Sequence, residues 1–188
     1  MAKTLSGPVW VARFPTSKSP NDLVDPFKTN VQKFLAALKA AGATVSIAAT
    51  RRPKERAFLM HFSFRMARED FDPEQVPPMA RVEIDWVHRD AAGAKSVAES
   101  KKAAEQMVAG YEIVRRPSLT SHHIEGIAID MDIAWTAAEL KIADAAGQAV
   151  SIKTSPKSGQ NSELQRVGGS YGVLKLLDDP PHWSADGR

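Results

Sequence analysis

The sequence predicts an α+β fold, and three patterns along the chain support this prediction. Apolar residues recur at helical spacing from Phe27 to Leu38, apolar and polar residues alternate from Gly126 onward, and residues 140–152 show the pattern of a β-hairpin. A chain of 188 residues is long enough to bury a sizeable core. We therefore expect one domain over residues 1–188.

The first expected helix begins at Asp25-Pro26, which supplies a capping carboxylate and a proline in the first turn, and it closes at Gly42. Its apolar stripe is formed by Phe27, Val31, Phe34, Leu35 and Leu38. After it, Val45, Ile47 and Ala49 alternate as a short strand. This strand leads into Thr50-Arg51-Arg52-Pro53, which we expect to be a loop.

Two further helices and a hairpin are expected downstream. The second helix places Phe58, Leu59, Phe62 and Met66 on one side, and the proline-interrupted residues 70–90 predict an irregular stretch. Ser96 and Glu99 form a capping-box pattern for a third helix that runs toward Gly110. Residues 140–142 and 150–152 flank a turn at 145–148 and predict the hairpin.

The stretch Ser121–Asp130 predicts a loop that carries a histidine into a strand. From Gly126 onward, the large apolar side chains alternate with small or acidic ones, so a strand would turn its apolar residues toward a core and its carboxylates away from it. Gly126 allows a turn or a close approach of the backbone. The apolar set is Ile127, Ile129, Met131 and Ile133, and the other set is Ala128, Asp130 and Asp132.

His123 and Asp130 are candidate metal ligands, because neutral imidazole and carboxylate are ordinary ligands of zinc. A catalytic zinc commonly uses three protein ligands and leaves one position for water, so a third ligand is required. The stretch 177–183 supplies His182, with the carboxylate of Asp179 three residues before it. Since the chain has no cysteine, any metal site must use His, Asp or Glu.

The ten residues 121–130 fit the pattern S-x-H-x-x-G-x-A-x-D, and residues 179–182 fit D-x-x-H. In both motifs the chain resembles the family of zinc D-Ala-D-Ala carboxypeptidases and L-alanyl-D-glutamate endopeptidases, which includes phage endolysins and, by fold, the hedgehog signalling domain. The resemblance implies a small antiparallel sheet packed against helices beside a zinc cleft. It also implies that His123, Asp130 and His182 hold the Zn²⁺.

The resemblance assigns two catalytic roles outside the ligand set. Asp179 takes the place of the family's general base, although many relatives have glutamate there. Arg52, followed by Pro53, takes the place of the arginine that stabilises the substrate carbonyl or the transition state. Arg51 then stands where relatives have an aromatic residue, and His122 where they often have arginine.

Other residues near these motifs have less specific readings. We expect His122 at the surface or behind the ligands, because neighbouring residues in extended backbone point apart. Asp132 either orients a ligand or is a solvated strand end. We expect His61 to be structural, and core packing is the default expectation for Trp135 and Trp183.

The resemblance implies zinc-dependent hydrolysis of peptide bonds in the stem peptide of peptidoglycan. No wall-binding module is recognised in the sequence, which favours a phage-type endolysin with L-alanyl-D-glutamate endopeptidase activity. Two alternatives stay open. One is a D-Ala-D-Ala carboxypeptidase, and the other is an inactive, zinc-containing module that binds the cell wall.

Composition excludes other classes of partner. The net charge is +3, but the basic residues are scattered and form no stripe with aromatic residues, so we expect no nucleic-acid partner.

No apolar run is long enough to cross a bilayer, and residues 1–20 lack the pattern of a signal peptide. We expect a monomer that is made in the cytoplasm and acts on the cell wall after release.

Overall fold

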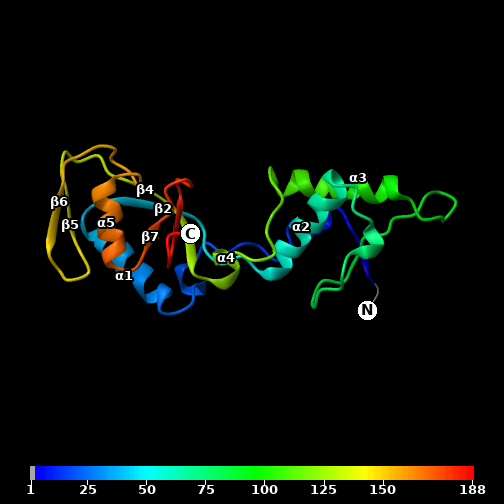
Figure 1. Cartoon of the computed structure of the whole chain (residues 1–188), viewed down its shortest axis with the longest axis horizontal. Coiled ribbons are helices and arrows are strands. Elements are labelled where there is room, and N and C mark those ends of the chain that lie inside the picture. Colours follow the sequence, from blue (N-terminus) through cyan, green and yellow to red (C-terminus); the bar gives the residue numbers. More distant parts are fainter. Residues whose placement is uncertain (1–2) are drawn as a thin grey trace. The chain divides into compact units, whose positions relative to one another are not determined.

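The computed structural model describes residues 3–188 and has a mixed helical and sheet architecture, which confirms the α+β class (Figure 1). The helices are α1 (Phe27–Ala40), α2 (Lys54–Arg68), α3 (Val97–Gly110), α4 (His122–Glu125) and α5 (Ser162–Ser170). The strands are β1 (Thr4–Leu5), β2 (Thr44–Ala49), β3 (Ile84–Asp85), β4 (Ala128–Ala134), β5 (Leu140–Ala143), β6 (Ala149–Ile152), β7 (Leu174–Lys175) and β8 (His182–Ser184). Among the described helices, none combines the length with the apolar composition that a membrane span needs.

The chain divides into two compact units. The first unit is Met1–Pro15 with Pro53–Thr120, and the second unit is Thr16–Arg52 with Ser121–Arg188. Each unit has its own cluster of buried apolar side chains. The length of the chain predicted one domain over residues 1–188. That stays a prediction, because two clusters do not decide whether the units fold separately.

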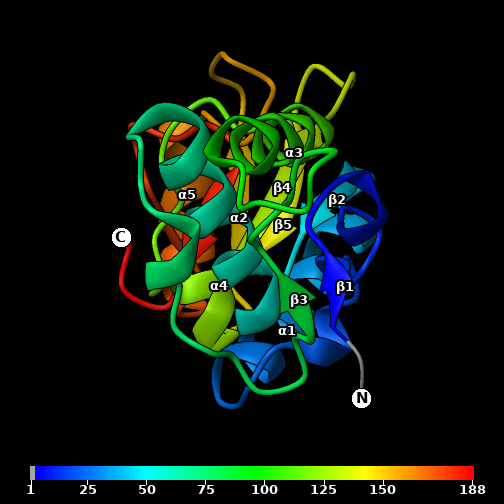
Figure 2. The same ribbon diagram turned by 90° about the vertical axis from the view of Figure 1, so that its right-hand side faces the viewer.

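The first unit is built on helices α2 and α3, which lie side by side (Figure 2). The predicted stripe of α2 is buried, namely Phe58, Leu59, Phe62 and Met66. The α3 helix begins as predicted, since the Ser96 Oγ accepts a hydrogen bond from the Glu99 N–H at 3.2 Å. The stretch 70–90, expected to be irregular, contributes a single 3₁₀ turn and the short strand β3, which pairs in parallel with β1.

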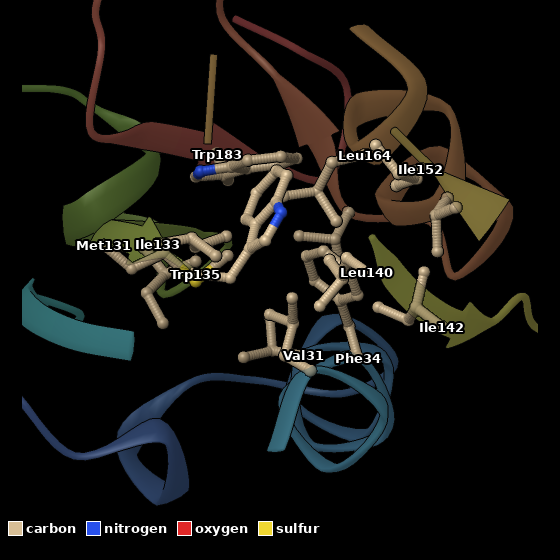
Figure 3. Packing of buried hydrophobic residues seen from close by; sticks show 14 of the residues in the cluster. Val31, Phe34, Met131, Ile133, Trp135, Leu140, Ile142, Ile152, Leu164 and Trp183 are labelled. Atoms are coloured by element: carbon tan, nitrogen blue, oxygen red, sulfur yellow. The ribbon is translucent and has the colours of Figure 1, made fainter. Parts of the chain in front are cut away.

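The second unit contains an antiparallel sheet with the strand order β2-β4-β8-β7. Helix α1 contributes Val31 and Phe34 to the core of this unit, together with residues of the sheet and of the hairpin (Figure 3). The predicted helix therefore buries its stripe except for Leu35, which is partly buried, and it ends at Ala40 rather than at Gly42. The predicted hairpin is also present, with Leu140 opposite Ile152 in the β5–β6 pair.

Both tryptophans in question belong to the core. Trp183 is fully buried, and its ring centre lies 5.7 Å from that of Phe34. Trp135 is 5% exposed and packs in the same cluster (Figure 3). The default expectation of core packing is confirmed for both side chains.

The segment before β4 is a one-turn helix, α4, rather than the expected loop. The Ser121 Oγ accepts from the Ile124 N–H at 3.4 Å and caps the start of the turn. Gly126 ends it with a positive φ of 78°, a conformation that glycine adopts without steric cost. A polar cap and a glycine five positions apart make a single turn favourable, and apolar periodicity does not report such short helices.

Beyond Gly126, strand β4 alternates as expected. The apolar side chains of Ile129, Met131 and Ile133 are buried, and Asp132 is exposed. Ala128 is buried as well, although it belongs to the other set of alternating positions. The period of two thus holds along the strand, and Asp130 faces away from the apolar core.

Replacing Gly126 with alanine should destabilise the second unit for two reasons. An alanine at position 126 would have to adopt a positive φ, and its Cβ would lie 3.2 Å from Val24 Cγ1. The first effect alone costs roughly 1–2 kcal/mol. Gly147→Ala is the matched control, because Gly147 has a φ of 80° and its Cβ would meet nothing within 4 Å. Denaturant titration should show a larger loss of unfolding free energy for Gly126→Ala, and equal losses would contradict crowding by Val24.

Candidate metal centre

Three side chains converge in the second unit to form a group that could hold a metal ion. His123 comes from α4, Asp130 from β4 and His182 from β8, and one potential ligand atom of each lies within 4.8 Å of the others. The Asp130 Oδ1 lies 3.1 Å from His123 Nε2 and 2.9 Å from His182 Nδ1. The two imidazole rings are nearly perpendicular, at 76°. The structure therefore brings together the three ligands predicted from sequence.

The register of the sheet places two of the three residues, Asp130 and His182, next to each other. Asp130 on β4 lies directly opposite His182 on β8. Because side chains alternate across a strand, Trp183 points into the apolar core while His182 points away from it. Two residues 52 positions apart in sequence thus become a cross-strand pair.

The end of β2 orients the remaining ligand. The His123 Nδ1 donates to the carbonyl of Thr50 at 2.6 Å. Thr50 is fully buried and is itself fixed, since its N–H donates to the Ser17 carbonyl at 2.7 Å and its Oγ1 to the Ser19 carbonyl at 3.0 Å. A carbonyl behind an imidazole sets its tautomer and its orientation, as is usual for metal-binding histidines.

When both rings are neutral, the bonds of their other nitrogens to backbone carbonyls leave three electron pairs facing one another. Carbonyl oxygens only accept, so the Nδ1–H of His123 points to Thr50 and its Nε2 carries a lone pair when the ring is neutral. His182 is arranged in the same way, with its Nε2 3.2 Å from the Arg188 carbonyl and its Nδ1 toward Asp130. Two lone pairs and a carboxylate oxygen repel each other unless a proton or a cation lies between them. The residues present therefore fit a metal ion.

The electrostatics of the group also favour a cation. Burial tends to raise the pKa of Asp130, but its hydrogen bonds with His123 and His182 outweigh this and hold the pKa well below its ordinary value. The hydrogen bond to Asp130 raises the pKa of His182, against the effect of burial. His123 is 6% exposed and His182 is 9% exposed. A carboxylate that stays ionised between two largely buried imidazoles is a strong electrostatic attractor for a positive charge.

His122 and Asp132 lie outside this group. The His122 Nε2 is 2.8 Å from Asp186 Oδ1, and its Nδ1 is 3.3 Å from Glu125 Oε2. The structure thus brings His123, and not its neighbour His122, to Asp130. Asp132 is exposed and lies opposite Ser46 on β2, which favours the solvated strand end over a role in orienting a ligand.

Asp179 is exposed on the turn between β7 and β8, close to the ligand group. Its carbonyl accepts a hydrogen bond from the His182 N–H at 3.0 Å. The hydrogen bond to Asp130 is the main cause of the raised pKa of His182, and the negative charge of Asp179 shifts this pKa in the same direction. The backbone of Asp179 therefore lies next to His182, and the part of its carboxylate in catalysis stays a prediction.

Arg52 lies beside His123 along the backbone. Its N–H donates to the His123 carbonyl at 2.9 Å, and the residue is half-buried. Arg51 is exposed, and its carbonyl accepts from the Ser17 N–H at 2.9 Å. The expected loop at the end of β2 thus brings the main chain of Arg52 to α4. The role of its guanidinium stays a prediction.

One residue of this region is not predicted by the sequence. Lys175 is half-buried on β7, and its Nζ donates to the carbonyls of Leu176, Asp179 and His182. Burial lowers the pKa of Lys175, while the charges of Asp179 and Asp130 oppose this shift. A two-residue strand has too few positions to show a period, so sequence patterns give no signal for Lys175.

No protein-family model matches the chain, and no curated protein matches it. The case for a function therefore depends on the residues of the site and on their arrangement.

His123→Ala and His182→Ala should abolish metal binding, because each removes one of three ligands. Elemental analysis after dialysis against zinc should find about one ion per chain in the parent protein and little in either variant. His122→Ala is the matched control and should retain the metal. Loss of metal from His122→Ala together with full retention in His123→Ala would contradict this ligand assignment.

Proposed function

We propose that this chain is a zinc-dependent peptidase that cuts the stem peptide of peptidoglycan and that it has a hedgehog/DD-peptidase-like fold. The observation that carries the proposal is the convergence of His123, Asp130 and His182 within 4.8 Å of one another. Two nitrogen ligands, one oxygen ligand and no cysteine suit Zn²⁺ in a catalytic site. The antiparallel sheet that carries two of the ligands supports the fold assignment.

His123, Asp130 and His182 would hold the zinc ion. When bound there, the zinc ion would supply a Lewis acid that lowers the pKa of a water and polarises the substrate carbonyl. His123 and His182 can each offer a nitrogen lone pair to a metal ion, because a backbone carbonyl accepts the N–H of the other ring nitrogen. Asp130 contributes the negative charge.

Asp179 would be the general base. The residue is exposed to solvent, and its backbone carbonyl accepts the His182 N–H, so its carboxylate could take a proton from a water near that histidine. The same carboxyl would then give the proton to the nitrogen of the departing amine. The pair of proton transfers leaves Asp179 ionised, as it was at the start.

Arg52 would stabilise the negative charge that develops on the carbonyl oxygen of the substrate. A guanidinium offers several donors in a fixed plane, which suits an oxyanion better than the compact ammonium of lysine. The hydrogen bond from the Arg52 N–H to the His123 carbonyl ties this residue to the helix that carries a ligand. The main chain of Arg52 is thereby anchored beside His123.

The proposed substrate is the L-alanyl-D-glutamate bond of the stem peptide, in the manner of a phage endolysin. Purified sacculi, incubated with the metal-loaded protein and analysed by mass spectrometry, should release soluble fragments with a new N-terminal D-glutamate. Release of free D-alanine without solubilisation would identify a D-Ala-D-Ala carboxypeptidase instead. Binding to sacculi without any product would identify an inactive wall-binding module and would refute the proposed activity.

Asp179→Ala should separate catalysis from metal binding. The variant should keep its fold and its metal, because Asp179 is exposed and lies outside the ligand group, but its turnover should fall by roughly a hundredfold or more. Asp178→Ala is the matched control at the neighbouring exposed position and should remain active. If Asp178→Ala were inactive and Asp179→Ala active, the two carboxylates would have been assigned the wrong way round.

Arg52→Ala should lower kcat and kcat/KM together, because an interaction made in the transition state is lost from both quantities. A loss on the order of a hundredfold is typical for the removal of one donor to an oxyanion. Arg52→Lys should recover only part of the activity, and Arg51→Ala should retain most of it. A raised KM with an unchanged kcat would instead show that Arg52 binds the ground state.

A further inference from the structure

The turn that joins β7 to β8 carries Asp179 and leads directly to His182. Three backbone hydrogen bonds close it. The Leu176 N–H donates to the His182 carbonyl at 3.1 Å, the Asp179 N–H to the Leu176 carbonyl at 3.4 Å, and the His182 N–H to the Asp179 carbonyl at 3.0 Å. Pro180 and Pro181 have no N–H of their own, so this turn has few amides with which to stabilise itself.

The ammonium group of Lys175 contacts the same three carbonyls. Its Nζ donates to the Leu176 carbonyl, to the Asp179 carbonyl at 2.5 Å and to the His182 carbonyl at 3.1 Å. Each of these oxygens also accepts one of the backbone amides that close the turn. An ammonium has three N–H donors, so one side chain can supply a second donor to every closing carbonyl.

Lys175 is well placed to hold this position. It lies opposite Trp183 in the β7–β8 pair, and its Nζ is 5.8 Å from the centre of the indole ring. Trp183 is fully buried in the core of the second unit. The lysine side chain is therefore supported by a rigid aromatic neighbour while its charged end reaches the turn.

Other contacts hold different parts of the turn. The Met131 N–H donates to the Pro181 carbonyl at 2.8 Å, and Gln160 Nε2 donates to the Pro180 carbonyl at 2.8 Å. Neither of these donors reaches the carbonyls of Leu176, Asp179 or His182 in the described structure. Lys175 thus connects Leu176 at the start of the turn with Asp179 and His182 through hydrogen bonds to their carbonyls.

We propose that Lys175 is a positioning residue, which fixes the β7–β8 turn so that His182 faces Asp130 and the Asp179 carboxylate stays beside the ligand group. Positioning of this kind affects reactivity, because small displacements of a ligand or a base weaken metal binding and proton transfer. The part that concerns His182 depends only on the metal site. The part that concerns Asp179 rests on the proposed peptidase function.

Hydrogen exchange on the metal-free protein tests the first part without any activity. In Lys175→Met, the amides of Leu176, Asp179 and His182 should exchange faster by roughly tenfold, as expected for the loss of hydrogen bonds to a charged group. Amides of α1 should be unchanged. Lys153→Met is the matched control for charge, since Lys153 has a side chain that is 72% exposed and pairs with Glu139 at 4.0 Å.

Competition with a chromophoric chelator supplies the second readout. Lys175→Met should bind zinc more weakly by roughly 10–100-fold, the usual range for a residue that supports a ligand, and Lys153→Met should match the parent. Lys175→Arg should recover part of the affinity, because it restores a charged donor. In the active protein, Lys175→Met should lower kcat more than it changes KM.

Two results would overturn the proposal. One is unchanged exchange in the turn together with a zinc affinity equal to that of Lys153→Met. The other is a uniform loss of protection across the second unit, which would make Lys175 a merely structural residue. If Lys175→Met does not fold, Lys175→Gln, which keeps two donors without the charge, allows the same comparison. If the parent protein cuts no sacculi, the proposed function fails, while the exchange and chelator results still decide the role of Lys175.

Discussion

The pairing of β4 with β8 is the constraint on which the candidate metal site depends. This register sets Asp130 opposite His182 and, one position further along β8, turns Trp183 into the core. A shift by one residue would exchange the two faces of β8, burying the histidine and exposing one of the two tryptophans of the cluster. Burial of an indole therefore stabilises the same register that forms the site. Core packing and ligand geometry are enforced by a single alignment.

The site also depends on polar groups that lie behind the ligands. Thr50 is fully buried, and its backbone and hydroxyl groups are hydrogen-bonded to Ser17, Ser19 and His123. Leaving such groups unpaired would cost free energy, so the strand end is held rigid. The Thr50 carbonyl engages the Nδ1 of His123, so the Nε2 is the nitrogen that faces Asp130. The orientation of the ligand thus originates in a loop that contributes no ligand.

The ligand group differs in character from the turn that carries the proposed base. The former is largely buried, formed by regular strands and a capped helical turn. The latter is exposed, contains two prolines and is closed by amides that share their acceptors with Lys175. An exposed base can exchange protons with solvent, and a ligand on the adjoining strand cannot move far. Lys175 donates to the carbonyls of Asp179 and His182. It therefore links the exposed turn to the buried ligand group over seven positions of the chain.

The sequence by itself identified the candidate ligands, the α+β class and most elements, because short motifs and local patterns indicate them. The stripe of α1, the alternation of β4 and the cap of α3 are each visible within a few residues. The fixed spacing from His123 to Asp130 likewise lies within one short segment. The short helix α4 was not predicted, because a single turn is too short to show a helical period of apolar residues.

The tertiary structure alone decided how distant residues meet. The pairing of Asp130 with His182, the carbonyl of Thr50 behind His123 and the contacts of Lys175 join segments that no local pattern relates. The division of the core into two clusters is also a property of long-range packing. Periodicity reports which face of an element is apolar, but it does not report which neighbour covers that face. Strand register and side-chain packing make that choice, and they exist only in the folded chain.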